Sequence, residues 1–138
     1  MDDSQAPFVG NRAIRVLIVD DQPAVRRGLK MRLELEPDVE VIGEAGDGAA
    51  AIALATEAQP DIVLMDVEMP GMDGISATRA LRAAAPHSAV VVLTLYDDTA
   101  TRARAKEAGA AAFVAKHRME EELLAVVRRA AFGRPENR

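Results

Sequence analysis

The sequence contains no cysteine and no tryptophan, and aromatic residues make up only 3% of its 138 residues. The absence of cysteine excludes disulfides and suits a reducing cytosol. No stretch near Met1 has the pattern of a signal peptide, and charged residues interrupt every apolar run before it is long enough to cross a bilayer. We therefore expect a cytoplasmic protein that does not associate with membranes.

An excess of positive charge is also missing from the chain. The 17 basic and 22 acidic residues give a formal net charge of −5, which argues against wholesale binding to nucleic acid. The carboxyl end is locally basic, through Arg128, Arg129, Arg134 and Arg138. We interpret this cluster as a solvated helix end rather than as a DNA contact.

The length and the pattern of the chain predict a single domain over residues 13–132. Residues 1–12 are polar, contain Pro7 and Gly10 and show no period, so we expect them to form a flexible arm. Residues 133–138 are interpreted as the start of a linker or as a carboxyl-terminal tail.

Short apolar runs alternate with stretches of helical period. The runs expected to be strands are Ile14–Val19, Val39–Ala45, Ile62–Met65, Ala89–Leu93 and Ala112–Ala115. The stretches expected to be helices run from Pro23 to near Pro37, from about Ala49 to Ala58, from Ile75 to Ala84, from a cap at Thr99 to Ala108, and from about Glu120 to Ala131. Glu40 and Glu44 in the second strand favour an edge position for it. The alternation predicts an α/β domain whose parallel sheet is covered by helices on both faces.

Asp66 stands where the third apolar run stops. Ile62 to Met65 fit a short strand buried on both faces, and the dipeptides Pro70-Gly71 and Asp73-Gly74 turn the backbone soon after it. Asp66 is therefore expected to lie between a rigid strand and a tight loop. An aspartate in such a place is more often a turn residue or a helix cap than a nucleophile, so the position alone does not assign its role.

Polar side chains also close the other expected strands. Asp20 and Asp21 follow the first strand, Thr94 follows the fourth and Lys116 follows the fifth. Right-handed crossovers bring the carboxyl ends of parallel strands to one edge of the sheet, where ligands bind. Each residue also has an ordinary explanation, as a cap, a turn residue or a surface charge. Together with Asp66 they predict an acidic pocket with one cation and one hydroxyl donor.

The charge balance of this pocket favours a bound cation. Three carboxylates and one lysine leave a charge of about −2 in a partly desolvated cleft, which is costly unless a cation joins them. Oxygen ligands without histidine or cysteine favour Mg²⁺ or Mn²⁺. With the metal bound, Asp66 can act as a nucleophile toward phosphorus and form an aspartyl phosphate, while Lys116 neutralises and Thr94 hydrogen-bonds the phosphoryl oxygens.

These residues, with the stretch Met69-Pro70-Gly71-Met72-Asp73-Gly74, resemble the receiver domain of bacterial two-component response regulators over about residues 14–132. The resemblance implies a flavodoxin-like (βα)5 fold with the strand order 2-1-3-4-5. It also implies that Asp66 accepts a phosphoryl group from a sensor histidine kinase. The protein would then be a signalling phosphoacceptor with slow autodephosphorylation rather than an enzyme.

The resemblance further assigns metal ligands and rate-tuning positions. Asp21, Asp66 and the backbone carbonyl of Glu68 are expected to bind Mg²⁺, with Asp20 acting through water. The conformational switch that the resemblance implies needs two packings of the domain whose free energies differ by only a few kcal/mol. The positions that tune the dephosphorylation rate in the family are Glu68, Tyr96 and Leu95.

Thr94 and Phe113 resemble the family's switch pair, in which the hydroxyl moves toward the phosphoryl group and the ring turns inward. The fourth helix, fifth strand and fifth helix would then carry the output. Lys116 is followed by His117, where many receivers have proline, which removes a constraint on the lysine backbone. We expect both histidines, His87 and His117, to be surface residues.

The stretch Leu93-Thr94-Leu95-Tyr96-Asp97-Asp98, together with His117, looks most like the NarL/FixJ (LuxR-type) subfamily. Its receivers precede a helix-turn-helix domain, so DNA would be bound only through such a domain outside this chain. A stand-alone regulator is the alternative. A homodimer that forms on phosphorylation is a further expectation of the resemblance.

Three other functions remain open at this point. A haloacid-dehalogenase-type phosphatase uses similar residues, but it has them in another chain order and needs a second aspartate where this chain has Glu68. A flavodoxin-like cofactor binder needs a phosphate-binding loop after the first strand, where Asp20 and Asp21 would repel a phosphate. A receiver that works without phosphorylation, as an interaction module, is the third.

Overall fold

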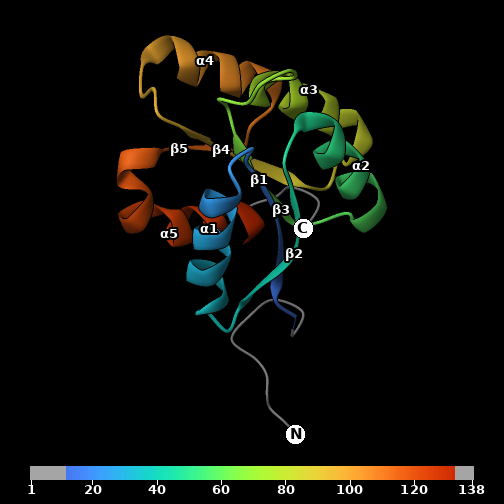
Figure 1. Cartoon of the computed structure of the whole chain (residues 1–138), viewed down its shortest axis with the longest axis vertical. Coiled ribbons are helices and arrows are strands. Elements are labelled where there is room, and N and C mark those ends of the chain that lie inside the picture. Colours follow the sequence, from blue (N-terminus) through green and yellow to red (C-terminus); the bar gives the residue numbers. More distant parts are fainter. Residues whose placement is uncertain (1–11, 133–138) are drawn as a thin grey trace, which may run out of the picture.

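The structure is a computed structural model that describes residues 12–132 (Figure 1). The expected arm, except for Arg12, and the expected linker at 133–138 lie outside these residues. The strands are β1 (Ile14–Val19), β2 (Val39–Ala45), β3 (Ile62–Asp66), β4 (Ala89–Thr94) and β5 (Ala112–Ala115). The helices are α1 (Pro23–Glu34), α2 (Gly48–Ala58), α3 (Gly74–Ala84), α4 (Thr99–Ala108), the short 3₁₀ helix η3 (Lys116–Arg118) and α5 (Met119–Phe132).

All five strands are parallel and lie in the order β2-β1-β3-β4-β5. The order confirms the predicted fold class and the edge position of β2. Met65 of β3 pairs with Val19 of β1 and with Val92 of β4, so the carboxyl ends of neighbouring strands reach one level. The register between β1 and β2 shifts between Val16 and Leu17.

Helices cover both faces of the sheet. Figure 1 shows α1 and α5 on one side of it and α2, α3 and α4 on the other, and each group has its own apolar core. In β3, Ile62 and Leu64 belong to the core with α1 and α5, whereas Val63 and Met65 belong to the core with the other three helices. Every residue of β3 is buried, which is why its first four residues, Ile62 to Met65, form an unbroken apolar run. None of the helices within residues 12–132 is both long and apolar enough to span a membrane.

The predicted helix boundaries are close to the observed ones, with one error in capping. α1 begins at Pro23, whose fixed φ and missing N–H suit the first turn. The cap of α4 is Asp98 rather than the predicted Thr99: its carboxylate accepts a hydrogen bond from the backbone N–H of Thr101 at 2.7 Å. Aspartate and threonine are both good N-caps, and the sequence pattern could not distinguish two neighbouring candidates.

Candidate functional site

The carboxyl edge of the sheet brings the predicted site residues together. Asp20 follows β1, Asp66 and Thr94 are the last residues of β3 and β4, and Lys116 follows β5. The first three are buried, with 1%, 1% and 0% of their surface exposed. Lys116 is half-buried, so its stem packs while its ammonium group reaches the carboxylates.

The ammonium group of Lys116 lies at the centre of the acidic groups. Its Nζ donates a hydrogen bond to Asp66 Oδ1 at 2.9 Å. It also lies 3.7 Å from Glu68 Oε1 and 3.9 Å from Asp20 Oδ2. The backbone N–H of Glu68 donates to the same Asp66 oxygen at 3.1 Å, so two donors fix the orientation of this carboxylate.

Asp20, Asp21 and Asp66 form a group of oxygens that fits a divalent cation. Each offers one carboxylate oxygen, and these oxygens all lie within 4.8 Å of one another. Asp20 Oδ1 accepts a hydrogen bond from the backbone N–H of Gln22 at 2.9 Å, but Oδ2 is buried and has no hydrogen-bond partner within the described part of the chain. A buried carboxylate oxygen without a donor is costly, and a cation with oxygen preference would satisfy it.

The same crowding changes the proton affinity of Asp66. Burial and the charge of nearby Asp20 raise its pKa from 3.8 to about 6, against the hydrogen bonds from Lys116 and from the backbone of Glu68. For Lys116, burial lowers the pKa, but its hydrogen bond to Asp66 and the surrounding carboxylates outweigh burial and raise it. The lysine is therefore charged at neutral pH.

The loop after Asp66 is held close to the strand end. Gly74 packs so tightly that a Cβ there would clash with the Asp66 carbonyl oxygen and lie 2.8 Å from Val67 Cα. Its backbone N–H donates to the Val67 carbonyl at 3.1 Å. The carboxylate of Asp73 caps α3 by accepting from the Ser76 backbone N–H at 2.8 Å. The predicted position of Asp66 between a strand and a tight loop is therefore confirmed.

The hydrogen bonds of the Glu68 side chain are a part of the site that the sequence did not reveal. Its backbone carbonyl was expected to bind the metal and its side chain to tune the dephosphorylation rate, but its contacts were not predicted: the carboxylate accepts a hydrogen bond from the Thr94 hydroxyl at 2.6 Å and one from the Leu95 backbone N–H at 3.2 Å. The signal in the sequence was closeness to the strand end, since Glu68 follows Asp66 by two residues. Sequence alone could not show the path of the backbone after the strand, which bends at Val67.

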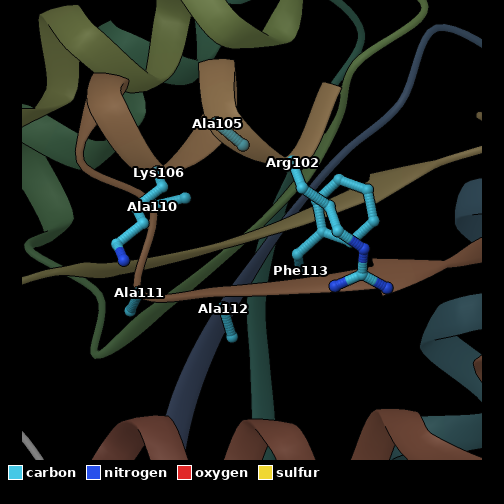
Figure 2. Close-up of a pocket in the computed structure, with 7 residues that line it drawn as sticks. All are labelled: Arg102, Ala105, Lys106, Ala110, Ala111, Ala112 and Phe113. Atoms are coloured by element: carbon cyan, nitrogen blue, oxygen red, sulfur yellow. The ribbon is translucent and has the colours of Figure 1, made fainter. Parts of the chain in front are cut away.

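The other predicted residues lie at the margin of the site. Thr94 Oγ1 accepts a hydrogen bond from the Tyr96 backbone N–H at 3.0 Å, while the side chains of Leu95 and Tyr96 are exposed. Phe113 of β5 is half-buried, and Figure 2 shows the Arg102 guanidinium over its ring, 4.3 Å from the centroid. Arg102 also pairs with Asp97 at 2.8 Å.

Phe113 and Arg102 border a hollow of about 270 Å³ between α4 and β5 (Figure 2). Its lining is otherwise made of small residues and one lysine stem: Ala105, Lys106, Ala110, Ala111 and Ala112. The aromatic ring therefore packs against the core on the α2, α3 and α4 side and also borders open space. Both histidines, His87 and His117, are exposed, as expected.

The fold and this edge of the sheet define an α/β domain with an acidic site, and comparison with known proteins gives its family. A family model described as a response regulator receiver domain matches residues 16–128. The chain belongs to this family.

The relatives include transcriptional regulators of the NarL/LuxR type. The chain is 43% identical over 122 residues to the transcriptional regulatory protein LiaR of Bacillus subtilis (strain 168), covering 88% of this chain and 58% of LiaR. It is 40% identical over 119 residues to the nitrate/nitrite response regulator protein NarP of Escherichia coli (strain K12), covering 86% of this chain and 55% of NarP. The chain thus spans little more than half the length of these relatives.

Solved structures give the same result. The signal receiver domain of the putative response regulator NarL from Mycobacterium tuberculosis superimposes with a TM-score of 0.84 at 37% identity. The match covers 89% of this chain and 99% of that chain. The similarity confirms the flavodoxin-like receiver fold and the subfamily resemblance.

Proposed function

We propose that Asp66 is the phosphoacceptor of this receiver domain and that a sensor histidine kinase is the donor. The observation that carries the proposal is the meeting of Asp20, Asp21, Asp66 and Lys116 at one edge of the sheet, with Lys116 Nζ 2.9 Å from Asp66 Oδ1. A carboxylate oxygen of Asp66 forms a bond to phosphorus as the phosphorus–nitrogen bond of the phosphohistidine breaks. The bonding electron pair goes to the imidazole nitrogen, which then takes a proton from water.

Asp21, Asp66 and the Glu68 backbone carbonyl are the groups that would hold Mg²⁺ or Mn²⁺, with Asp20 acting through a water molecule. The ion, when bound, neutralises the negative charge of the phosphoryl oxygens. The buried, unsatisfied Oδ2 of Asp20 supports this assignment. Lys116 holds Asp66 in position and presents a positive charge to the incoming group.

Thr94 and Phe113 form the switch in this proposal. The Thr94 hydroxyl binds a phosphoryl oxygen, and the ring of Phe113 moves inward behind it. The hollow beside Phe113 supports a movable ring, because the ring is not enclosed by packed side chains on the side that borders the hollow. The surface of α4, β5 and α5 then carries the output, and the side chains of Glu68, Tyr96 and Leu95 tune the lifetime of the phosphate.

The effector of the proposed pathway is a helix-turn-helix domain that binds DNA and controls transcription. The support is that the relatives are transcriptional regulators and that the chain covers 58% of LiaR and 55% of NarP. In this proposal residues 13–132 form the receiver unit, and phosphorylation favours a homodimer. A phosphoacceptor of this kind acts in the cytoplasm and turns over slowly.

The test is to incubate the purified chain with acetyl phosphate and Mg²⁺ and to measure its intact mass. We expect the mass to increase by one phosphoryl group per chain. The increase should not occur when a chelator removes Mg²⁺ from the incubation, and it should not occur in Asp66→Asn. Asp47→Asn is the matched control, since it removes the same charge at the same edge and asparagine still caps α2. Persistent labelling of Asp66→Asn, or rapid repeated turnover of a phosphomonoester, would contradict the proposal.

A further inference from the structure

We propose that the side chain of Glu68 is an internal substitute for the phosphoryl group. In the unphosphorylated protein its carboxylate holds the hydrogen-bond donors that the phosphoryl oxygens need, and it has to leave before a phosphoryl group can enter. This inference rests on the proposed function and adds a gate to the same site.

The contacts of the Glu68 carboxylate carry the inference. Oε2 accepts a hydrogen bond from the Thr94 hydroxyl at 2.6 Å, Oε1 accepts one from the Leu95 backbone N–H at 3.2 Å, and Lys116 Nζ lies 3.7 Å from Oε1. A hydroxyl, a backbone N–H and an ammonium group therefore converge on one anionic group. This is the donor set that stabilises the oxygens of a transferred phosphoryl group.

The orientation of Asp66 does not use this carboxylate. Asp66 is oriented by Lys116 and by the backbone N–H of Glu68, and neither contact uses the Glu68 side chain. The Glu68 side chain keeps 24% of its surface exposed, so it can turn into solvent by changing rotamer. The carboxylate can therefore leave while the nucleophile stays in place.

The Glu68 carboxylate opposes entry of a phosphoryl group in two ways. Its charge lies beside Lys116 and repels another anion, and its oxygens occupy the Thr94 and Leu95 donors. Removing the side chain abolishes both effects, whereas shortening it to aspartate keeps the charge and withdraws the oxygens by one methylene. Comparing the two variants therefore distinguishes the effect of occupying the Thr94 and Leu95 donors from the effect of the negative charge.

The experiment measures the affinity of the Mg²⁺-loaded protein for fluoroberyllate, a mimic of the phosphoryl group, by calorimetry. We expect about tenfold tighter binding in Glu68→Ala and several-fold tighter binding in Glu68→Asp, on the scale of a hydrogen bond to a charged group. Glu57→Gln is the control, because it removes one charge from an exposed side chain in the last turn of α2, and its affinity should equal that of the wild type. Affinities within twofold of the wild type in both Glu68 variants overturn the inference, and so does a gain in Glu68→Ala without any in Glu68→Asp.

A second readout reports displacement directly. In NMR spectra of the wild type, the side-chain carboxyl carbon of Glu68 and the backbone amide of Leu95 should both shift when fluoroberyllate is added. A Glu68 carboxyl resonance that stays in place overturns the inference. Failure of the proposed function looks different: the wild type would then bind no more fluoroberyllate than Asp66→Asn does.

Discussion

Asp66, the proposed phosphoacceptor, destabilises the folded protein while it is charged. Its pKa of about 6 in the folded state lies above the ordinary value of 3.8, so the folded protein binds a proton here more tightly than the unfolded chain does. The free energy of unfolding therefore falls as pH rises between these two values. The charged carboxylate therefore lowers the stability of the folded state above this pH range.

Replacing Asp66 by asparagine should remove this pH dependence. The measurement is made with a metal chelator present. We expect the difference between the unfolding free energies of Asp66→Asn and the wild type to grow by roughly 2–3 kcal/mol from pH 4 to pH 7, since each pKa unit is worth about 1.4 kcal/mol. Urea unfolding at several pH values measures it. A difference that does not change with pH would show that burial does not strain this carboxylate.

Single residues show how far sequence reasoning reaches. Asp20, Asp66, Thr94 and Lys116 could be predicted to meet because strand ends in a parallel sheet share an edge. The Glu68 side chain could not, because its direction depends on the backbone of a loop with no regular period. Their chemical roles rest on the family resemblance and on the tests proposed above.

At the scale of elements, the β3–α3 connection positions Asp66 through close packing at Gly74. We expect Gly74→Ala to destabilise the protein by roughly 1–3 kcal/mol, the usual cost of overpacking, and to slow phosphorylation by displacing Asp66. Gly28→Ala in α1 is the matched control: a Cβ at this position meets nothing within 4 Å outside its own helix, and alanine should stabilise the helix by about 0.5–1 kcal/mol. Equal effects of the two substitutions in urea unfolding would contradict the role assigned to Gly74.

Elements also contact one another in ways that the sequence did not predict. Arg128, which the sequence alone places in a solvated helix end, pairs with Asp38 at 2.8 Å and with Glu36 at 2.9 Å and so joins α5 to the segment between α1 and β2. Surface charges that are 90 residues apart leave no local pattern, so this pairing follows only from the packed fold. Strand and helix positions, in contrast, follow from local periods and were largely predictable.

For the whole molecule, the fold class was predictable because burial on both faces of the sheet leaves unbroken apolar runs. The strand order came from the family resemblance instead, since no run of residues encodes which strands are neighbours. Folding brings the acidic side chains of the site together at one edge of the sheet, whereas the unfolded chain keeps them apart. Cation binding should therefore be coupled to folding.

Mg²⁺ should raise the stability of the folded chain. At ten times its dissociation constant, a ligand that binds only the folded state adds about 1.4 kcal/mol, or roughly 4–6 °C in Tm for a domain of this size. We expect Asp21→Ala to lose most of this gain in thermal unfolding, while Asp47→Asn keeps it. An equal shift in Asp21→Ala would exclude Asp21 as a ligand.

The measurement that tests the central claim most directly is to locate the phosphoryl group on the chain. Borohydride reduces an aspartyl phosphate to homoserine, and tandem mass spectrometry then finds the modified position. We predict homoserine at position 66 alone, and only after incubation with both phosphodonor and Mg²⁺. Homoserine at position 20 or 21, or none at any position, would contradict the assignment of Asp66 as the phosphoacceptor.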